Sequence, residues 1–268
     1  MKTAIITLSN KGKVLADILS KAMPEATIYL HNDISSSECA NEKIFDSTIK
    51  LTAEIFGEYE LLVYIMPCGV VVRALDGNIK SKKTDPAVVV VDVGGRFAVS
   101  LLSGHEGGAN TAAVNIANIL GAEPVVSTTT EAVKNLIVGI GCRKGAEAND
   151  IIEAINTGLS EIGADVEDVR LLASADIKSE ETGLLEAGEK LNIPIRFISS
   201  EEIRNTRRDF QCSKFVQEKV NLPAVAEPAA LLAGSRTEIV LPRKIVNHVT
   251  VAIARERCLW LGSDRAGS

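Results

Sequence analysis

Aromatic residues are scarce in this chain of 268 residues: they make up 4% of it, whereas hydrophobic residues of all kinds make up 46%. A core with few aromatic rings must be built from valine, isoleucine, leucine and alanine, which favours buried strands and alanine-rich helices. The charged fraction of 24% is ordinary for a globular enzyme and argues against a disordered chain.

Cysteine is also sparse, and no two cysteines have the spacing of a zinc finger. The five are Cys39, Cys68, Cys142, Cys212 and Cys258. Because their number is odd and their spacing irregular, we expect reduced thiols in a cytoplasm rather than a disulfide framework.

Long uncharged runs are missing as well. No stretch approaches the roughly 18 apolar residues of a membrane span, and charges interrupt the apolar start MKTAIITLSNKGK before a secretory signal is complete. The net charge of −6 and the pI of about 5.3 disfavour nonspecific binding to nucleic acid. We therefore expect a soluble, cytoplasmic protein with no membrane or nucleic-acid partner.

Short apolar runs alternate with helical periods along most of the chain, which is the pattern of parallel α/β folds. A second, similar succession starts at Leu136. We predict an α/β fold of two domains, each a mostly parallel sheet flanked by helices. Residues 1–134 form the N-terminal domain, with the SGHEGGAN loop, and residues 135–268 form the C-terminal domain, with the GIGCRKG loop.

Several local patterns make more specific predictions. The run AVVVVDV-GG-RFAVSLL (87–102) predicts a β-hairpin. Residues 35–56 predict one helix with serines at its start, and residues 149–163 predict a helix that Asn149 caps. Residues 214–220 predict a further helix.

Four loops follow strands and precede helices, so we expect them at the carboxyl ends of the strands, where parallel α/β sheets bind ligands. They are residues 66–75 (MPCGVVVRAL), 103–110 (SGHEGGAN), 139–145 (GIGCRKG) and 175–183 (ADIKSEETG). Glycines there let an anionic ligand approach the free N–H groups of a helix start. The alternative is that the glycines only make tight turns.

Neither glycine-rich loop is a nucleotide-binding fingerprint. Lys144 stands where G-x-G-x-x-G needs its third glycine, and no G-x-x-x-x-G-K-[ST] or G-x-S-x-G is present. Cations near the loops predict a polyanionic small ligand, with a solvated surface as the alternative. These cations are Arg73, Lys80, Lys82, Lys83, Arg96, Arg143, Lys144 and Lys178.

His105 is the candidate for acid–base chemistry, because imidazole titrates near neutrality and this one lies among glycines. Glu106 beside it is either its partner or an acid at a helix start. His31 and His248 lie at strand ends without such company, and we expect them to be structural or exposed.

The segments CGVVVRAL, KTDPAVVVVD, LLSGHEGGAN and STTTEA resemble the N-terminal region of the cobalt-precorrin-5A hydrolases (CbiG) of anaerobic cobalamin (vitamin B12) biosynthesis. LIVGIGCRKG, DIKSEETGLLEAGEKLNIPIRFISSEEI and AVAEPAALLAG resemble the C-terminal domain of that family, so the resemblance covers about residues 60–255. Two features depart from the family pattern. The usual variable segment between the two regions is absent, and Thr182 replaces a proline.

The resemblance implies a hydrolase that opens the δ-lactone of a cobalt tetrapyrrole and releases acetaldehyde, giving cobalt-precorrin-5B. Cobalt arrives inside the substrate, so the resemblance implies no cofactor and no metal site of the protein. Metal ligation by His105 together with cysteines is an alternative. The acetate and propionate groups of the substrate would explain the cationic loops.

On this basis we expect four catalytic candidates. His105, oriented by Glu106, activates the water, and N–H groups around Gly104–Gly108 stabilise the oxyanion. His105, Asp85 or Glu227 takes a proton in the retro-aldol fragmentation that follows, with a structural cap as the alternative for Glu227. Cys68 and Cys142 are alternative nucleophiles, but neither has a base nearby in the sequence.

The expected substrate-binding residues share either a cationic head or a place in a glycine loop: Arg73, Lys83, Gly104, Gly107, Gly108, Asn110, Gly141, Arg143, Lys178 and Glu181. Arg73 and Arg143 suit carboxylates because a guanidinium binds them in bidentate fashion. For Lys178, Glu180 and Glu181 the alternative is a surface ion-pair cluster.

The alternative function is a carrier that binds a tetrapyrrole intermediate without chemistry. Besides the anionic substrate, the expected partners are a second copy of the chain, through the apolar segment CLWL (258–261), and transient contacts with neighbouring pathway enzymes.

Overall fold

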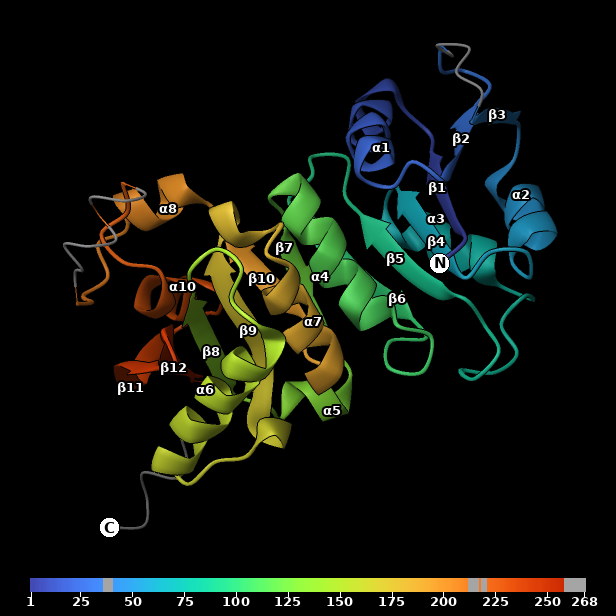
Figure 1. Cartoon of the computed structure of the whole chain (residues 1–268). Helices are drawn as coiled ribbons and strands as arrows, with labels where there is room; N and C mark the ends of the chain where they lie inside the picture. The colour runs from blue at the N-terminus through green and yellow to red at the C-terminus, as the bar shows by residue number, and fades with distance from the viewer. Residues whose placement is uncertain (36–40, 212–216, 218–220, 258–268) are drawn as a thin grey trace. The chain divides into compact units, whose positions relative to one another are not determined.

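The computed structural model of the chain describes residues 1–35, 41–211, 217 and 221–257. The chain divides into two compact units, Met1–Thr128 (unit 1) and Thr129–Ser268 (unit 2). Each unit holds one sheet flanked by helices, and most strand pairs are parallel, which confirms the predicted α/β class (Figure 1). No helix in the described part of the chain is long and apolar enough to cross a membrane.

Unit 1 is built on a seven-stranded sheet with the order β3-β2-β1-β4-β5-β6-β7. All neighbouring pairs are parallel except β5 and β6. Its elements are β1 (Thr3–Thr7), α1 (Asn10–Ala22), β2 (Thr27–His31), β3 (Glu42–Phe45), α2 (Thr48–Ile55), β4 (Leu61–Ile65), α3 (Cys68–Leu75), β5 (Ala87–Val91), β6 (Phe97–Leu102), α4 (Ala109–Leu120) and β7 (Glu123–Val125).

The central strands of unit 1 are buried on both faces, because successive side chains point to opposite sides of the sheet. On β4, Val63 packs into one core and Leu62 and Tyr64 pack into the other. Helices α1 and α4 cover the first core, and α2 and α3 cover the second (Figure 1). The hydroxyl of Tyr64 lies 2.9 Å from Thr52 Oγ1, and burial raises the pKa of this tyrosine to about 12.

The predicted hairpin is confirmed, since β5 and β6 are antiparallel and joined by a turn at Asp92. The Asp92 carboxylate accepts hydrogen bonds from the backbone N–H groups of Gly94, Arg96 and Phe97, and from Arg96 Nε. Burial alone would raise the pKa of Asp92, but these hydrogen bonds together lower it. Both carboxylate oxygens of Asp92 are therefore committed to the turn.

The prediction of one helix over residues 35–56 was wrong. Within the described residues this stretch holds strand β3 and then helix α2, which Ser47 caps by accepting the N–H of Lys50. Strand β3 exists because it pairs in parallel with β2 and extends the sheet. A local helical pattern does not register such a tertiary contact.

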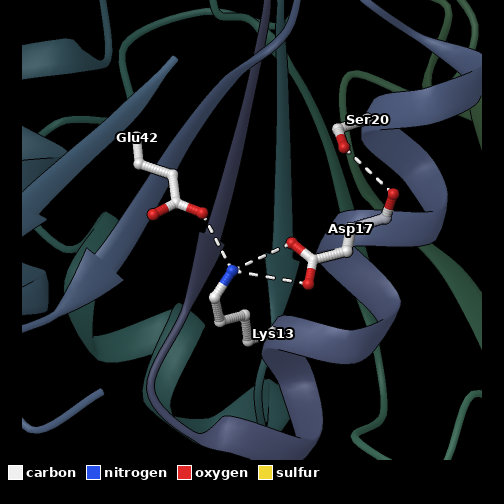
Figure 2. Close-up of polar contacts among 4 residues, drawn as sticks. All are labelled: Lys13, Asp17, Ser20 and Glu42. Carbon is white, nitrogen blue, oxygen red and sulfur yellow. Dashed lines mark hydrogen bonds and ion pairs between the residues drawn. The ribbon is translucent and has the colours of Figure 1, made fainter. Parts of the chain in front are cut away.

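Lys13 fastens α1 to β3 (Figure 2). Its Nζ lies 2.8 Å from Glu42 Oε1 and 3.1 Å from Asp17 Oδ1. Burial works to lower the pKa of Lys13, but the hydrogen bonds to the two carboxylates outweigh it and the pKa is raised. Only 3% of the Glu42 side chain is exposed, so this is a largely buried ion pair in which each charge depends on its partner.

Unit 2 is built on a five-stranded sheet with the order β10-β9-β8-β12-β11. Strands β8, β9 and β10 are parallel, and β12 and β11 extend the sheet in antiparallel fashion. Its elements are α5 (Thr129–Ala132), β8 (Leu136–Gly141), α6 (Ala148–Glu161), η1 (Val166–Asp168), β9 (Val169–Ala175), η2 (Asp176–Lys178), α7 (Thr182–Leu191), β10 (Ile195–Ile198), α8 (Ser200–Asn205), α10 (Ala226–Leu232), β11 (Thr237–Val246) and β12 (Val249–Glu256).

Glycines let helices of unit 2 approach their neighbours closely. A Cβ on Gly139, in the middle of β8, would lie 1.9 Å from the carbonyl oxygen of Ala226 in α10. A Cβ on Gly183, in the first turn of α7, would lie 1.9 Å from the carbonyl oxygen of Ala146. Neither position has room for a side chain, so the fold itself requires glycine at both.

The predicted cap Asn149 was wrong, because α6 begins one residue earlier, at Ala148. Ala148 is buried in the core of unit 2, and its packing draws the helix start back. Asn149 Oδ1 instead accepts a hydrogen bond from Lys190 Nζ at 3.4 Å.

Some predictions lie outside the described residues. They concern the helix over residues 214–220 (apart from Gln217), the apolar segment 258–261, and the cysteines Cys39, Cys212 and Cys258.

Candidate active site

The SGHEGGAN segment lies between β6 and α4, at the amino-terminal edge of the parallel strands of unit 1. Strand β6 runs antiparallel to β5, so Leu102 at its end pairs with Val88 near the start of β5. The loop after β4 lies at the opposite, carboxyl-terminal edge. Our expectation that these two loops meet at the carboxyl ends of the strands was therefore wrong, because one antiparallel strand reverses the direction of the chain.

Arg73 belongs to the helix that starts at that other edge. Its side chain is exposed, and its Nη1 donates a hydrogen bond to the carbonyl of Gly69 at 3.0 Å. In the described part of the chain, no hydrogen bond or ion pair joins Arg73 to residues 103–110. The structure thus does not bring Arg73 to the glycine loop through a direct polar contact.

The glycine loop, residues 103–108, is folded around Ser103. This residue has a φ of +55°, and its carbonyl accepts the N–H groups of Gly107 (3.1 Å) and Ala109 (3.2 Å). Its hydroxyl donates to the backbone carbonyl of Asp85 at 3.0 Å. Ser103 therefore joins the glycine loop to the loop of residues 80–85, a role for which the sequence carries no recognisable signal.

Each glycine of the loop has a steric reason. A Cβ on Gly107 would lie 2.5 Å from the Cβ of Ser103, and one on Gly104 would lie 2.6 Å from Asn110 Oδ1. Gly108 caps α4 with a φ of +83°, a conformation that L side chains avoid. Among the described residues, the N–H groups of Gly104 and Gly108 have no hydrogen-bond acceptor, so they remain able to donate to a ligand.

His105 and Glu106 are both exposed at the tip of the loop. Glu106 Oε1 lies 2.6 Å from Lys82 Nζ, and this lysine is the main reason why the pKa of Glu106 is lowered. A hydrogen bond from His105 to the Glu106 carboxylate, which would orient the imidazole, is not found among the described residues. Glu106 instead ties the glycine loop to the loop of residues 80–85, next to Lys83.

Asp85 is the buried acid of this site, with 7% of its surface exposed. Its Oδ2 accepts the backbone N–H groups of Lys80 (2.9 Å) and Ser81 (3.0 Å). Its Oδ1 has no hydrogen-bond partner among the described residues. Asp85 therefore shapes its own loop with one oxygen and keeps the other available.

Asn110 is 9% exposed and lies at the start of α4. Its Oδ1 accepts a hydrogen bond from Ser100 Oγ at 2.8 Å, and its Nδ2 donates to Thr128 Oγ1 at 2.9 Å. These bonds use the side-chain amide inside unit 1. They give Asn110 a role in holding the glycine loop against β6, in addition to any contact with a ligand.

A cavity of about 340 Å³ adjoins the glycine loop. The sequence did not single out one of its walls, residues 56–60, which only appeared to end a helix. The cavity is lined by Phe56, Gly57, Glu58, Tyr59, Glu60, Thr84, Asp85, Pro86, Ala87 and Gly107. It thus brings Asp85 and a glycine of the SGHEGGAN segment to one surface.

In unit 2, Glu181 joins the two remaining loops. Its Oε1 accepts the N–H of Gly145 at 2.6 Å, and its Oε2 pairs with Lys178 Nζ at 3.2 Å. These loops follow the parallel strands β8 and β9, so both lie at the carboxyl edge, as expected. Thr182, which replaces the family's proline, is the first residue of α7, the helical position that best tolerates proline.

A second cavity, of about 500 Å³, lies beside this contact. It is lined by Lys144, Gly145, Ala146, Glu147, Ala148, Asn149, Glu180, Glu181, Thr182, Gly183, Glu186 and Lys190. The exposed Arg143 directly precedes this lining, and the side chain of Lys178 reaches it through Glu181.

Cys142 directly follows Gly141, the last residue of strand β8, and does not form a nucleophilic site. Burial raises the pKa of the Cys142 thiol, against the lowering effect of Lys178, so this thiol is not activated as a thiolate. Gly141, the last residue of β8, lies against the residues at the start of α10, and a Cβ on it would lie 3.5 Å from Val225 Cβ. This position allows an ordinary contact and does not require glycine for space.

Glu227 is 3% exposed, in the first turn of α10. Its Oε1 accepts the N–H of Arg243 at 2.8 Å, and its Oε2 accepts the N–H of Gln211 at 2.5 Å. The carboxylate therefore holds strand β11 and the segment before residue 212 to α10. This arrangement favours the structural alternative for Glu227.

No group of three or more His, Cys, Asp or Glu side chains is arranged to hold a metal ion in the portion of the chain that the structure describes. The glycine loop and its neighbours instead offer the exposed imidazole of His105 and the buried carboxylate of Asp85. Among the described residues, one oxygen of that carboxylate and the N–H groups of Gly104 and Gly108 have no hydrogen-bond partner.

Both units of the chain match known protein families. Residues 50–131 match the family described as Cobalamin synthesis G N-terminal, and residues 136–254 match Cobalamin synthesis G C-terminus. The chain belongs to the CbiG family. The first match contains the glycine loop and Asp85, and the second contains both loops of unit 2 and Glu227.

Relatives in this family are named as hydrolases. The chain is 23% identical to the Cobalt-precorrin-5A hydrolase of Priestia megaterium over an alignment 352 residues long, which covers 94% of each chain. It is 37% identical over 115 residues to the Cobalt-precorrin-5A hydrolase of Salmonella typhimurium, covering 42% of this chain and 33% of that one. CbiG proteins thus form a hydrolase family of cobalamin biosynthesis, and this chain is one of them.

A solved structure similar to part of the chain is that of CobE, a protein from the cobalamin (vitamin B12) biosynthetic pathway. The TM-score is 0.42 at 28% identity, and the similarity covers 46% of this chain and 91% of CobE.

Proposed function

We propose that this CbiG protein opens the δ-lactone of cobalt-precorrin-5A and releases acetaldehyde, giving cobalt-precorrin-5B. The observation that carries the proposal is the glycine loop of unit 1, where an exposed imidazole lies beside N–H groups that have no acceptor among the described residues. Ser103 of this loop also donates a hydrogen bond to the backbone of the buried acid Asp85. Membership of a family whose relatives are named cobalt-precorrin-5A hydrolases supports the choice of substrate.

In the first step, His105 removes a proton from water, and the water oxygen attacks the lactone carbonyl to form a tetrahedral oxyanion. When the oxyanion collapses, the ring C–O bond breaks, and the protonated imidazole returns its proton to the leaving oxygen, which becomes the carbinol hydroxyl. The imidazole is suited to this role because one of its ring nitrogens can accept a proton, and its exposure lets it reach a substrate too large to enter the protein. A base in this position typically contributes about 10²–10⁴-fold to the rate.

The oxyanion that forms needs hydrogen-bond donors. The N–H groups of Gly104 and Gly108 are free to donate, whereas those of Gly107 and Ala109 are used by Ser103. Loss of one oxyanion donor typically costs about 10²–10³-fold in rate. The Lys82–Glu106 ion pair and the Ser103–Asp85 hydrogen bond keep the loop in place for this purpose.

The acidic side chains of the substrate call for cations. At the glycine loop of unit 1 we assign Lys83 to these carboxylates, whereas Arg73 lies at the opposite edge of the sheet and is not assigned to this site. In unit 2, Arg143 and Lys178 are the candidate cations for carboxylates at the loops of that unit. Lys178 and Glu181 also hold the Gly145 loop in position. Cobalt comes with the substrate, and the proposal includes no cofactor of the protein.

The test is anaerobic incubation of the purified protein with cobalt-precorrin-5A, with acetaldehyde measured by a coupled dehydrogenase and the corrinoid product by mass spectrometry. We expect acetaldehyde and cobalt-precorrin-5B in equal amounts. Tight binding of the substrate without either product would instead establish a carrier of the intermediate.

A further inference from the structure

Asp85 differs from Asp92 and Glu227 in that one of its carboxylate oxygens has no hydrogen-bond partner among the described residues. In Asp92 both oxygens accept backbone N–H groups, and in Glu227 each oxygen accepts one. In Asp85 only one oxygen, Oδ2, accepts backbone N–H groups. A turn needs no more than that, so the second oxygen has no structural use among the described residues.

The free oxygen belongs to a residue that lines the cavity of about 340 Å³ beside the glycine loop. This volume is near the lower end of the range of about 300–1,000 Å³ that small-molecule sites occupy. The cavity therefore suits one group of the substrate rather than a whole macrocycle of four rings.

The lining decides which group that is. Three of the lining residues, Glu58, Glu60 and Asp85, are acids, and none is a lysine or an arginine. Acetate and propionate groups of the substrate would be repelled from such a wall. A neutral hydroxyl that donates a hydrogen bond is favoured, and the buried rings of Phe56 and Pro86 suit a methyl group beside it.

We infer that Asp85 is the base of the second step, in which the ring-opened substrate loses acetaldehyde. This inference rests on the proposed function. Lactone opening leaves a carbinol that carries a methyl group and a hydroxyl, which is the group that the cavity suits. Asp85 Oδ1 removes the hydroxyl proton, and the oxygen electron pair forms the carbonyl of acetaldehyde.

The carbon–carbon bond to the macrocycle breaks in the same step, and its electron pair passes into the conjugated macrocycle. The proton then moves from Asp85 to that macrocycle carbon, which restores the carboxylate. No oxidant or reductant is needed. The two steps thus use two different bases, His105 for water and Asp85 for the carbinol.

The test is Asp85→Asn. The asparagine side-chain oxygen still accepts the N–H groups of Lys80 and Ser81, while its amide nitrogen replaces the free oxygen and cannot accept a proton. We expect this variant to open the lactone and to accumulate the substrate plus one water. Acetaldehyde release should fall by about 10²-fold or more.

The matched control is Asp92→Asn, at the turn that joins β5 to β6, which should retain both steps. Each variant is also given the ring-opened hydroxy acid, prepared by chemical hydrolysis, so that fragmentation is measured alone. If Asp85→Asn fails to fold, Asp85→Ser replaces it: the serine hydroxyl can still accept a backbone N–H group of the loop but offers no carboxylate, so the same loss of fragmentation is expected, and fragmentation at the wild-type rate would overturn the inference.

Acetaldehyde release by Asp85→Asn at the wild-type rate would overturn the inference, as would a failure of this variant to open the lactone. Failure of the wild type to open the lactone would instead refute the proposed function, so the two failures are distinguishable.

Discussion

Replacing Glu227 by glutamine separates a structural carboxylate from a catalytic one. Glu227 is 3% exposed and accepts two backbone N–H groups, one on each oxygen. A glutamine keeps the size of the side chain, but its amide offers one accepting oxygen and turns an N–H donor towards the second N–H group. One hydrogen bond to a charged group is therefore lost, and a partly buried donor is left unpaired.

Hydrogen bonds to charged groups typically contribute about 1.5–3 kcal/mol. Because both N–H groups lie on residues that are themselves exposed, we expect a loss of about 2 kcal/mol from the free energy of unfolding of unit 2. That loss corresponds to a fall in Tm of about 4–8 °C. Urea and thermal unfolding followed by far-UV circular dichroism measure both quantities.

The matched control is Glu238→Gln on β11, where the carboxylate pairs with Arg257 and 40% of the side chain is exposed. Exposed pairs contribute little, so we expect a change below about 0.5 kcal/mol. Turnover per folded molecule should stay within about twofold of wild type in both variants. If Glu227→Gln keeps the wild-type stability but loses turnover by about 10²-fold or more, the structural role of Glu227 is refuted. Glu227 would then be a catalytic base.

Two further predictions concern the cores of the two units. Gly139→Ala places a Cβ 1.9 Å from the carbonyl oxygen of Ala226, so α10 must move, and we expect thermal unfolding to show a destabilisation of about 1–3 kcal/mol or more. The control is Gly57→Ala, which has open space around it and should change stability little. Equal stability of the two variants would contradict the close packing of α10 on Gly139. Burial raises the pKa of Tyr64 from 10.0 to about 12, so the unfolded state releases this proton first and the free energy of unfolding should fall as the pH rises from about 10 to about 12. In Tyr64→Phe this part of the pH dependence should disappear, and an unchanged slope between wild type and variant would show that Tyr64 does not cause it.

The alternation of apolar runs predicted most of the fold because it reflects burial, which is the property that forms strands and helices. The run of valines at 88–91 predicted β5, and the Gly-Gly turn that follows predicted its hairpin with β6. Strand β3 was missed because its conformation depends on pairing with β2, which lies outside the stretch of residues 35–56 that was predicted to be one helix. Such pairing leaves no local pattern.

The same hairpin explains why the position of the site was misjudged. An antiparallel β6 carries the chain back to the amino-terminal edge, so the SGHEGGAN segment lies with residues 56–60 and 80–85 rather than with the loop after β4. The rule that sites lie at carboxyl ends applies to parallel strands. Consistent use of the predicted hairpin would have given the correct edge.

The chemistry of single residues was less predictable than their neighbourhood. Asp85 and Glu227 are both acids that precede a proline in the sequence, and only the hydrogen bonds of the folded chain distinguish them. Gly139 resembled part of a ligand-binding loop, whereas its lack of a side chain serves the approach of α10. Hydrogen-bond partners and available space are properties of the folded state, so the sequence pattern did not carry them.

In the proposed reaction, the imidazole of the glycine loop activates water for lactone opening. The direct test compares His105→Asn with His248→Asn, which removes an exposed imidazole from the turn between β11 and β12, in single-turnover opening of cobalt-precorrin-5A by excess protein. We expect a rate about 10²–10⁴-fold lower for His105→Asn, with substrate affinity unchanged, and a wild-type rate for His248→Asn. Opening at the wild-type rate by His105→Asn would contradict this role of the imidazole.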